Sequence, residues 1–154
     1  MPKKIDLNLF FFIFRKMLTL VSNSNTEYKI KRDDVDISLT IKNLIEDTGI
    51  DQPIKFDNIN DSTLTLILDY CQNYKNEGWS QQIINMDITS LTDLVLAANY
   101  LDISLLLDLG CEIIANRLKG KSSEGMREIL QVTSDFSPEE EEKIRKEHEW
   151  MLDN

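Results

Sequence analysis

The sequence predicts an α+β (α/β) fold with a small sheet near the beginning of the chain and helices over most of the rest. Residues 18–22 and 27–31 are short segments of alternating apolar and polar residues, and the NSNT between them is rich in turn formers. This pattern is typical of a β-hairpin. From residue 90 onward, apolar residues recur at helical spacing. The strands are therefore expected early in the chain and the helices late.

A helix and a third strand are expected after the hairpin. Apolar residues beyond Val35 acquire helical spacing and Gly49 follows as a C-terminal stop, which predicts one helix over about 35–48. Residues 53–56, PIKF, favour a short third strand. Pro53 would begin that strand, where its missing backbone donor does least harm.

Residues 61–75 carry the apolar stripe of a helix that packs on a sheet, formed by Leu64, Ile67, Leu68 and Cys71. Either Asn60 or Asp61 can cap the N-terminus of this helix. The helical pattern fades between residues 76 and 86. This stretch, which contains Trp79, is expected to be a linker.

Two strongly apolar helices are expected next. Ser90, with Asp93 three residues later, can cap a helix that runs to Leu101, and Ser104 can cap another that ends before Gly120. The first has apolar side chains on every side. The second has a main stripe of Ile103, Leu106, Leu107, Cys111, Ile114 and Leu118, with other apolar residues beside it. Helices of this kind are either central core helices or surfaces for a partner, and periodicity alone leaves both interpretations open.

The last helices begin with recognisable caps. Ser122 can cap a segment that reaches Leu130, and Ser137, Pro138 and Glu140 supply an N-cap, an N1 proline and an N3 glutamate for the final helix. Most other side chains of the final helix are charged. They predict three ion pairs at i,i+4 spacing, Glu139 with Lys143, Glu141 with Arg145 and Glu142 with Lys146.

The two ends of the chain carry separate expectations. Residues 1–16 place Lys3 and Lys4 before an apolar run over 9–14, which is too short to span a bilayer and precedes no small-residue cleavage site. We expect an extension that is disordered or not native, with a membrane anchor as the alternative. Trp150 follows a helix with few apolar residues. It is expected to anchor a partner protein, although it could also fold back on its own domain.

Charge and composition argue against several functions. The chain has 27 acidic and 17 basic residues, a net charge of −10, and no basic cluster, so a nucleic-acid partner is not expected. His148 is the only histidine, and neither a glycine-rich phosphate loop nor a nucleophile–base pair is present. We therefore expect no enzymatic activity, cofactor, metal or small-molecule substrate. Cys71 and Cys111 lie in apolar helical patterns, which predicts buried, reduced thiols and a protein of the cytoplasm and nucleus.

The segment LAANYLDI at 96–103 resembles the S-phase-kinase-associated (Skp) adaptor family, the F-box-binding subunit of SCF-type ubiquitin ligases. The first half of the chain matches this family more loosely, through TIKNLIEDTG at 40–49, the helix that contains Cys71, and Trp79. In all, the resemblance covers about residues 17–154. Beyond LAANYLDI it continues through Leu106 and Leu107, Ile114, Ala115 and Asn116, KGK at 119–121, DFSPEEE at 135–141, IRKE at 144–147 and Trp150.

The resemblance implies a fold, partners and site residues. It implies a BTB/POZ fold with a small three-stranded sheet over 17–118, and two appended F-box-binding helices within 119–154. It further implies an adaptor that bridges F-box substrate receptors to a cullin scaffold in ubiquitin-dependent degradation. The cullin-facing positions carry over to Asn99 and Tyr100. The F-box-side positions carry over to Leu107, Cys111, Ile114, Leu118, Ile129, Phe136, Ile144 and Trp150.

Departures from the family and one rival function complete these expectations. The family's KTPEE start of the penultimate helix reads KSSEG here, so Gly125 replaces the reciprocal acid of a capping box. Some protist relatives carry a hydroxylated and glycosylated proline where this chain has Pro138. The favoured interpretation is that Pro138 only starts the helix, and modification is the alternative. The rival function is a BTB-type module that binds F-box proteins or self-associates without delivery to a cullin. Only an adaptor needs the Asn99 and Tyr100 surface.

Overall fold

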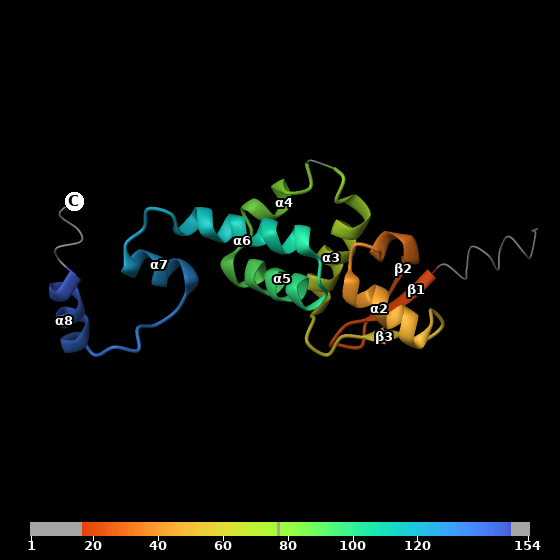
Figure 1. The fold of residues 1–154 in the computed structure, drawn as a ribbon, viewed down its shortest axis with the longest axis horizontal. Helices are drawn as coiled ribbons and strands as arrows, with labels where there is room; N and C mark the ends of the chain where they lie inside the picture. Colours follow the sequence, from red (N-terminus) through yellow and green to blue (C-terminus); the bar gives the residue numbers. More distant parts are fainter. Residues whose placement is uncertain (1–16, 77, 149–154) are drawn as a thin grey trace, which may run out of the picture. The chain divides into compact units, whose positions relative to one another are not determined.

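The computed structural model describes residues 17–76 and 78–148. The chain divides into two compact units, and the boundary along the sequence falls between Ala115 and Asn116. Each unit is described by itself (Figure 1). In chain order the elements are β1 (Met17–Val21), β2 (Glu27–Lys31), the 3-10 helix η1 (Arg32–Val35), α2 (Leu39–Thr48), β3 (Ile54–Lys55), α3 (Asp61–Asn73), α4 (Gln81–Ile84), α5 (Ile88–Tyr100), α6 (Ser104–Leu118), α7 (Ser123–Leu130) and α8 (Pro138–His148).

The sheet of the described chain has the strand order β2-β1-β3. β1 pairs antiparallel with β2, so that Leu18 lies opposite Ile30, and it pairs parallel with β3, so that Leu20 lies opposite Ile54. The predicted hairpin and third strand are therefore confirmed. The alternation in β1 also has its expected consequence, because Leu18 and Leu20 both point into the core and are fully buried.

The turn between β1 and β2 is held by its own polar side chains. The Ser22 amide donates to the Thr26 carbonyl at 3.0 Å, and the Thr26 amide donates to Ser22 Oγ at 3.2 Å. Asn25 takes a left-handed conformation with φ 64°, which asparagine tolerates better than most residues. Ser22 and Ser24 also donate to the carboxylate of Asp61 at the start of α3. These hydrogen bonds hold the pKa of Asp61 below its ordinary value and fasten the turn to α3.

One continuous hydrophobic core fills the first unit, and α3 packs between η1 and α5. Trp79 is buried in this core, with its indole N–H donating to Asp69 Oδ2 at 2.6 Å and its ring set edge-on to Tyr70 at 4.8 Å. Cys71 is buried as predicted, and burial raises the pKa of its thiol to about 12. The largest fully buried side chains are Phe56, Leu18, Leu20, Ile30, Ile41, Ile59, Leu64, Ile67, Ile83, Leu91, Leu94 and Leu101.

The helices α5 and α6 run alongside one another (Figure 1), and Gly110 of α6 lies against Val95 of α5. A Cβ atom on Gly110 would lie 2.4 Å from Cγ2 of Val95, so only glycine fits between the two helices without displacing a neighbour. The buried residues of α6 are Leu106, Gly110 and Ile113. They form a row at i, i+4 and i+7, which is the face that α6 turns toward the core.

Two local predictions in the first half were wrong. The segment 35–48 does not form one helix, because Val35 ends the 3-10 turn and α2 begins at Leu39. Ser38 separates the two elements. Its extended backbone and its side chain, which accepts from the Ile41 amide at 3.2 Å, make it the N-cap of α2. The stretch 76–86 is also not a plain linker, since it contains the short helix α4.

The N-caps of α3 and α5 decide between two predicted caps for α3 and correct the predicted cap of α5. Asn60, not Asp61, caps α3, because its side-chain oxygen accepts from the Thr63 amide at 2.8 Å. The predicted cap of the next helix, Ser90, is wrong. Asp87 caps α5 by accepting from the Ser90 amide at 2.9 Å, and the helix therefore begins at Ile88. Hydrogen bonds from the side chain and the backbone amide of Ser90 hold the pKa of Asp87 below its ordinary value.

The second unit contains α7 and α8 and has no buried residue over 116–147. The predicted capping box of α8 is confirmed. The Glu140 amide donates to Ser137 Oγ at 3.3 Å, and the Ser137 amide donates back to Glu140 Oε2 at 2.9 Å. Ser122 caps α7 as expected by accepting from the Gly125 amide at 3.2 Å. Short caps, and not a core, therefore define both helices.

The ion pairs of α8 differ in part from the prediction. Glu142 pairs with Lys146 at 3.4 Å, as expected, and also with Arg145. Glu141 instead accepts from Arg127 of α7 at 3.1 Å, which gives α7 and α8 a cross-link within the second unit. Pairs as exposed as these contribute only about 0–1 kcal/mol each.

Some sequence predictions fall outside the described residues, namely those for 1–16 and for Trp150. Among the residues that are described, no helix is both long enough and apolar enough to cross a membrane.

The close approach of α5 and α6 gives a stability prediction. We expect Gly110→Ala to lower the free energy of unfolding by about 1–2 kcal/mol, because overpacking of about 1–3 kcal/mol outweighs the better helix propensity of alanine. The stiff, β-branched Val95 cannot rotate away cheaply. Urea unfolding followed by circular dichroism measures the change.

Two companion variants identify the cause. Adding Val95→Ala should make Gly110→Ala much less harmful than it is alone, which a double-mutant cycle detects. Gly125→Ala is the matched control, since the nearest atoms to its added Cβ lie at 3.4 and 3.6 Å. A Gly110→Ala protein as stable as the parent, with no coupling to Val95, would show that the helices do not meet closely there.

Candidate functional site

The end of α5 presents the two residues expected on one partner-binding surface. Asn99 is exposed, and Tyr100 is 48% exposed although its ring packs edge-on to the buried Phe56 with ring centres 6.3 Å apart. Tyr100 therefore combines a held ring with an accessible outer face. An aromatic side chain fixed in this way loses little conformational entropy when a partner covers it.

The backbone that carries Asn99 and Tyr100 is fixed by the beginning of α2. Ser38 Oγ donates to the Leu101 carbonyl at 2.6 Å, and Thr40 Oγ1 donates to the Tyr100 carbonyl at 3.0 Å. The Leu39 and Thr40 amides donate to the carbonyls of Asp102 and Leu101, each at 3.4 Å. The N-terminus of one helix thus supplies donors to the C-terminus of another.

This junction leaves an apolar side chain at the surface beside it. Leu39 is 50% exposed at the first position of α2. Its amide reaches the carbonyl of Asp102, which follows the end of α5 and takes a left-handed conformation with φ 49°. Leu39 was missed as a surface residue, because the sequence placed it in the middle of a longer helix.

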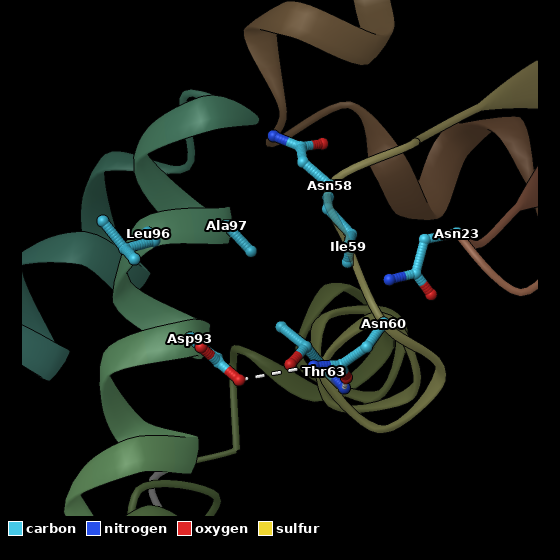
Figure 2. Close-up of a pocket in the computed structure, with 8 residues that line it drawn as sticks. All are labelled: Asn23, Asn58, Ile59, Asn60, Thr63, Asp93, Leu96 and Ala97. Atoms are coloured by element: carbon cyan, nitrogen blue, oxygen red, sulfur yellow. Dashed lines mark hydrogen bonds between the residues drawn. The ribbon is translucent and has the colours of Figure 1, made fainter.

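A pocket of about 350 Å³ lies beside α5 (Figure 2). Four segments of the first unit line it: the β1–β2 turn, the loop before α3, α3 itself and α5. Asn60 Nδ2 donates to Asp93 Oδ2 at 3.3 Å across it, as the dashed line in Figure 2 marks. The lining residues are Asn23, Asn58, Ile59, Asn60, Thr63, Asp93, Leu96 and Ala97.

The residues expected on the second partner-binding surface begin on α6. Leu107, Cys111, Ile114 and Leu118 follow one another at i, i+4, i+7 and i+11 along this helix, so they share a stripe. Cys111 is exposed and the other three are half-buried. The prediction of a buried thiol at Cys111 was therefore wrong. The core takes the neighbouring row with Ile113 and is also contacted by Leu107 and Ile114, so Cys111 is the only one of the four that is exposed.

The second unit exposes most of its apolar side chains. Of the predicted residues, Phe136 is 52% exposed, Ile144 is 40% exposed and Ile129 is half-buried. Met126, Leu130 and Val132 are exposed as well, although the sequence analysis did not assign them to a surface. The sequence carries a signal for Met126 and Leu130, because three of the eight residues of α7 are charged, whereas eight of the eleven residues of α8 are.

Pro138 is the first residue of α8 and lies within its capping box. A proline at this position needs no backbone donor and already has a helical φ, so the helix explains its presence. The modification of Pro138 stays a prediction. An intact-mass measurement on protein from the native source tests it, because hydroxylation adds one oxygen and glycosylation adds a sugar.

The described residues offer exposed aromatic and apolar side chains for binding. None of their histidine, cysteine, aspartate and glutamate side chains gather in groups of three or more that could hold a metal ion. Both cysteines are free thiols. What the arrangement can do is present held aromatic and apolar side chains to other proteins.

Comparison with known proteins identifies the family. The pattern of the Skp1 family dimerisation domain matches residues 104–151, and that of the Skp1 family tetramerisation domain, a POZ domain, matches residues 16–76. The chain belongs to the Skp1 family. The two matched segments hold the α6–α8 region and the strands with α2 and α3, so membership agrees with the α+β fold and the predicted resemblance.

Three relatives show the extent of the similarity, and each is named E3 ubiquitin ligase complex SCF subunit sconC. The relative from Emericella nidulans is 38% identical over 157 residues, which cover 90% of this chain and 98% of the relative. The relative from Talaromyces marneffei is 37% identical over 155 residues, which cover 88% of this chain and 97% of the relative. The relative from Arthroderma benhamiae is 37% identical over 153 residues, which cover 86% of this chain and 93% of the relative.

The junction between α2 and α5 gives the first prediction for the site. Ser38→Ala should lower the free energy of unfolding by about 1–3 kcal/mol, because a helix loses its cap and a buried carbonyl loses its closest donor. Thr65→Ala is the matched control, since this hydroxyl donates only within its own helix, to Asp61, and is exposed. It should stay within about 0.5 kcal/mol of the parent. Equal effects from the two variants would contradict the role of Ser38.

The capping box of α8 gives a pH prediction. The Ser137 amide holds the pKa of Glu140 below its ordinary value of 4.5, so the carboxylate stabilises α8 fully above that pH. The stabilisation is lost as the pH falls through the lowered pKa. The Ser137 amide proton, followed by NMR, should therefore titrate with a midpoint below 4.5. Glu140→Gln should abolish this titration and Glu139→Gln should preserve it. A midpoint at or above the ordinary value would contradict the capping contact.

Proposed function

We propose that this chain is the adaptor subunit of an SCF-type cullin ubiquitin ligase, which bridges F-box substrate receptors to the cullin scaffold. The single observation that carries the proposal is the presence of two separate sets of accessible side chains. One set lies at the end of α5 with the exposed Asn99 and Tyr100. The other begins on α6 with the exposed Cys111 and its half-buried neighbours, and recurs in the second unit with the exposed Phe136 and Ile144. The relatives named as SCF subunits support this assignment.

The first set suits a partner that binds a rigid surface. The hydrogen bonds from Ser38 and Thr40 fix the backbone of Tyr100 before any partner arrives. A preorganised surface of this kind suits a permanent scaffold, since little further ordering has to be paid for on binding. We assign this set to the cullin.

The second set suits a partner that completes a missing core. The second unit contains no buried residue over 116–147 and exposes several apolar side chains. Apolar area left open in this way gains about 25 cal/mol per Å² when a partner covers it. We assign this set to the F-box motif, with Trp150 as a further anchor predicted from the sequence.

The adaptor role is a non-catalytic one. Substrate choice then resides in the F-box protein, and ubiquitin transfer resides in other components of the ligase. We also propose that the protein works in the cytoplasm and nucleus, where its two free cysteines stay reduced. Fluorescence microscopy of the tagged chain in its native cell tests the location.

The cullin assignment predicts a selective loss of binding. Asn99→Lys combined with Tyr100→Lys should abolish binding to a cullin N-terminal domain, because two charges replace a neutral amide and an aromatic face. Binding to an F-box peptide should stay within about twofold, since rim and distant residues contribute little to affinity. Isothermal titration calorimetry measures both. Loss of both partners together would point to misfolding and not to a cullin surface.

The F-box assignment predicts the opposite selectivity. Phe136→Ala, Ile144→Ala and Trp150→Ala should each weaken F-box binding, by about 2 kcal/mol where the residue is a hot spot, and leave cullin binding unchanged. Ile84→Ala is the matched control, because Ile84 is 40% exposed on α4 and belongs to neither set. A parent chain that binds an F-box peptide but no cullin domain would favour the rival module that does not deliver to a cullin. Light scattering would show self-association.

A further inference from the structure

The pocket beside α5 is a preformed feature of the first unit. Asn60 holds it together, because its oxygen accepts from the Thr63 amide at 2.8 Å while its nitrogen donates to Asp93 at 3.3 Å. The Asn23 amide donates to the Ile59 carbonyl at 2.9 Å and so ties the β1–β2 turn to the loop before α3. Hydrogen bonds between separate segments therefore fix the walls before anything enters.

The chemistry of the lining favours a cationic group. Asp93 is the only charged residue among the eight that line the pocket, and Asn23, Asn58 and Asn60 add amide groups around it. A carboxylate offers about four lone-pair directions, and the described part of the chain directs one hydrogen bond at this one. Acceptor capacity therefore remains at Asp93. The net charge of −10 adds to the attraction for a positive ligand.

The pocket continues the surface that holds Tyr100. Asp93, Leu96 and Tyr100 stand at i, i+3 and i+7 on α5, so they follow one face of the helix. Leu96 lines the pocket, is 61% exposed, and lies between Asp93 and Tyr100 along the helix. With a rise of about 1.5 Å per residue, Asp93 and Tyr100 are about 10 Å apart along the axis. A single helix or loop of a partner can span that distance.

We propose that this pocket takes an arginine side chain from the same protein that docks on Asn99 and Tyr100. The guanidinium donates to the carboxylate of Asp93 and to the side-chain oxygens of neighbouring asparagines, and its five N–H groups suit several acceptors at once. Leu96 covers the aliphatic part of the side chain. The inference rests on the proposed function, in which the docking protein is the cullin, and adds a charged specificity contact to it.

Binding of a cullin N-terminal domain to the full chain tests the proposal. Asp93→Asn removes the charge and keeps the shape, and should weaken binding about tenfold in dilute salt, with a smaller loss at high salt where charges are screened. Asn58→Asp adds a second carboxylate to the pocket and should tighten binding. Asp47→Asn, an exposed acid at the far end of α2, is the control for net charge and should change little.

Arginine substitutions in the cullin domain identify the occupant. One Arg→Gln change in the cullin domain should be non-additive with Asp93→Asn in this chain. The two substitutions together should then weaken binding little more than either does alone. Lysine as the coupled residue, or no coupled residue at all, would overturn the arginine assignment. F-box peptide affinity, measured on every variant, should not move, which shows that Asp93→Asn still folds.

The outcomes separate this inference from the function on which it rests. A parent chain that binds no cullin domain overturns both. In the other informative outcome, the parent chain binds the cullin domain and the Asn99 and Tyr100 substitutions abolish that binding. If Asp93→Asn and Asn58→Asp then bind the domain with an affinity within twofold of the parent, the adaptor function stands and the pocket proposal is overturned.

Discussion

The carbonyl groups at the end of α5 obtain their donors from the beginning of α2, and the arrangement of the first unit depends on this junction. A helix ends with carbonyls that have no partner within the helix, and burying them unpaired is costly. The buried hydroxyl of Ser38 satisfies groups at both helix ends, because it donates to the Leu101 carbonyl and accepts from the Ile41 amide. The two helix ends also carry opposite partial charges, so their meeting is favourable. Tyr100 lies at that junction, so the hydrogen bonds that stabilise the junction also fix the backbone of a residue that we propose for cullin binding.

The second unit follows a different physical rule. Its helices have good caps and an ion pair between Arg127 and Glu141, yet none of its residues over 116–147 is buried. Short helices gain most of their stability from packing an apolar face, and caps alone leave them marginal. Under the proposed F-box assignment, the partner supplies the missing packing, and part of the binding free energy goes into ordering the segment. The first unit, with its continuous core, carries no such cost.

The sequence predicted those features that depend on neighbouring residues. The hairpin, the capping box of Ser137 and Glu140, and the stop at Gly49 all follow from local backbone chemistry, and the structure contains each of them. The orientation of α6 could not be predicted in this way. Cys111 and Ile113 are both apolar and stand two positions apart, and only the neighbouring helix decides which faces inward.

Long-range contacts explain the remaining differences. Gly110 looks like a weak point within a helix until Val95 of α5 is placed beside it. Ser38 was read as part of a longer helix because its main partner, Leu101, lies far along the chain. The pocket is still harder to predict from the sequence, because its lining comes from four segments whose proximity no local pattern encodes. The family resemblance adds the assignment of Asn99 and Tyr100 to a cullin surface, which periodicity could not suggest and which stays a prediction.

The helix α6 shows how packing against the core fixes a surface. Its inner row, Leu106, Gly110 and Ile113, is buried, and Leu107 also packs against the core. Cys111 lies exposed beside them and is held in register by the same helix. Under the proposed F-box assignment, a partner would therefore meet a stripe whose positions the core has already set, so that little ordering of α6 itself is needed on binding.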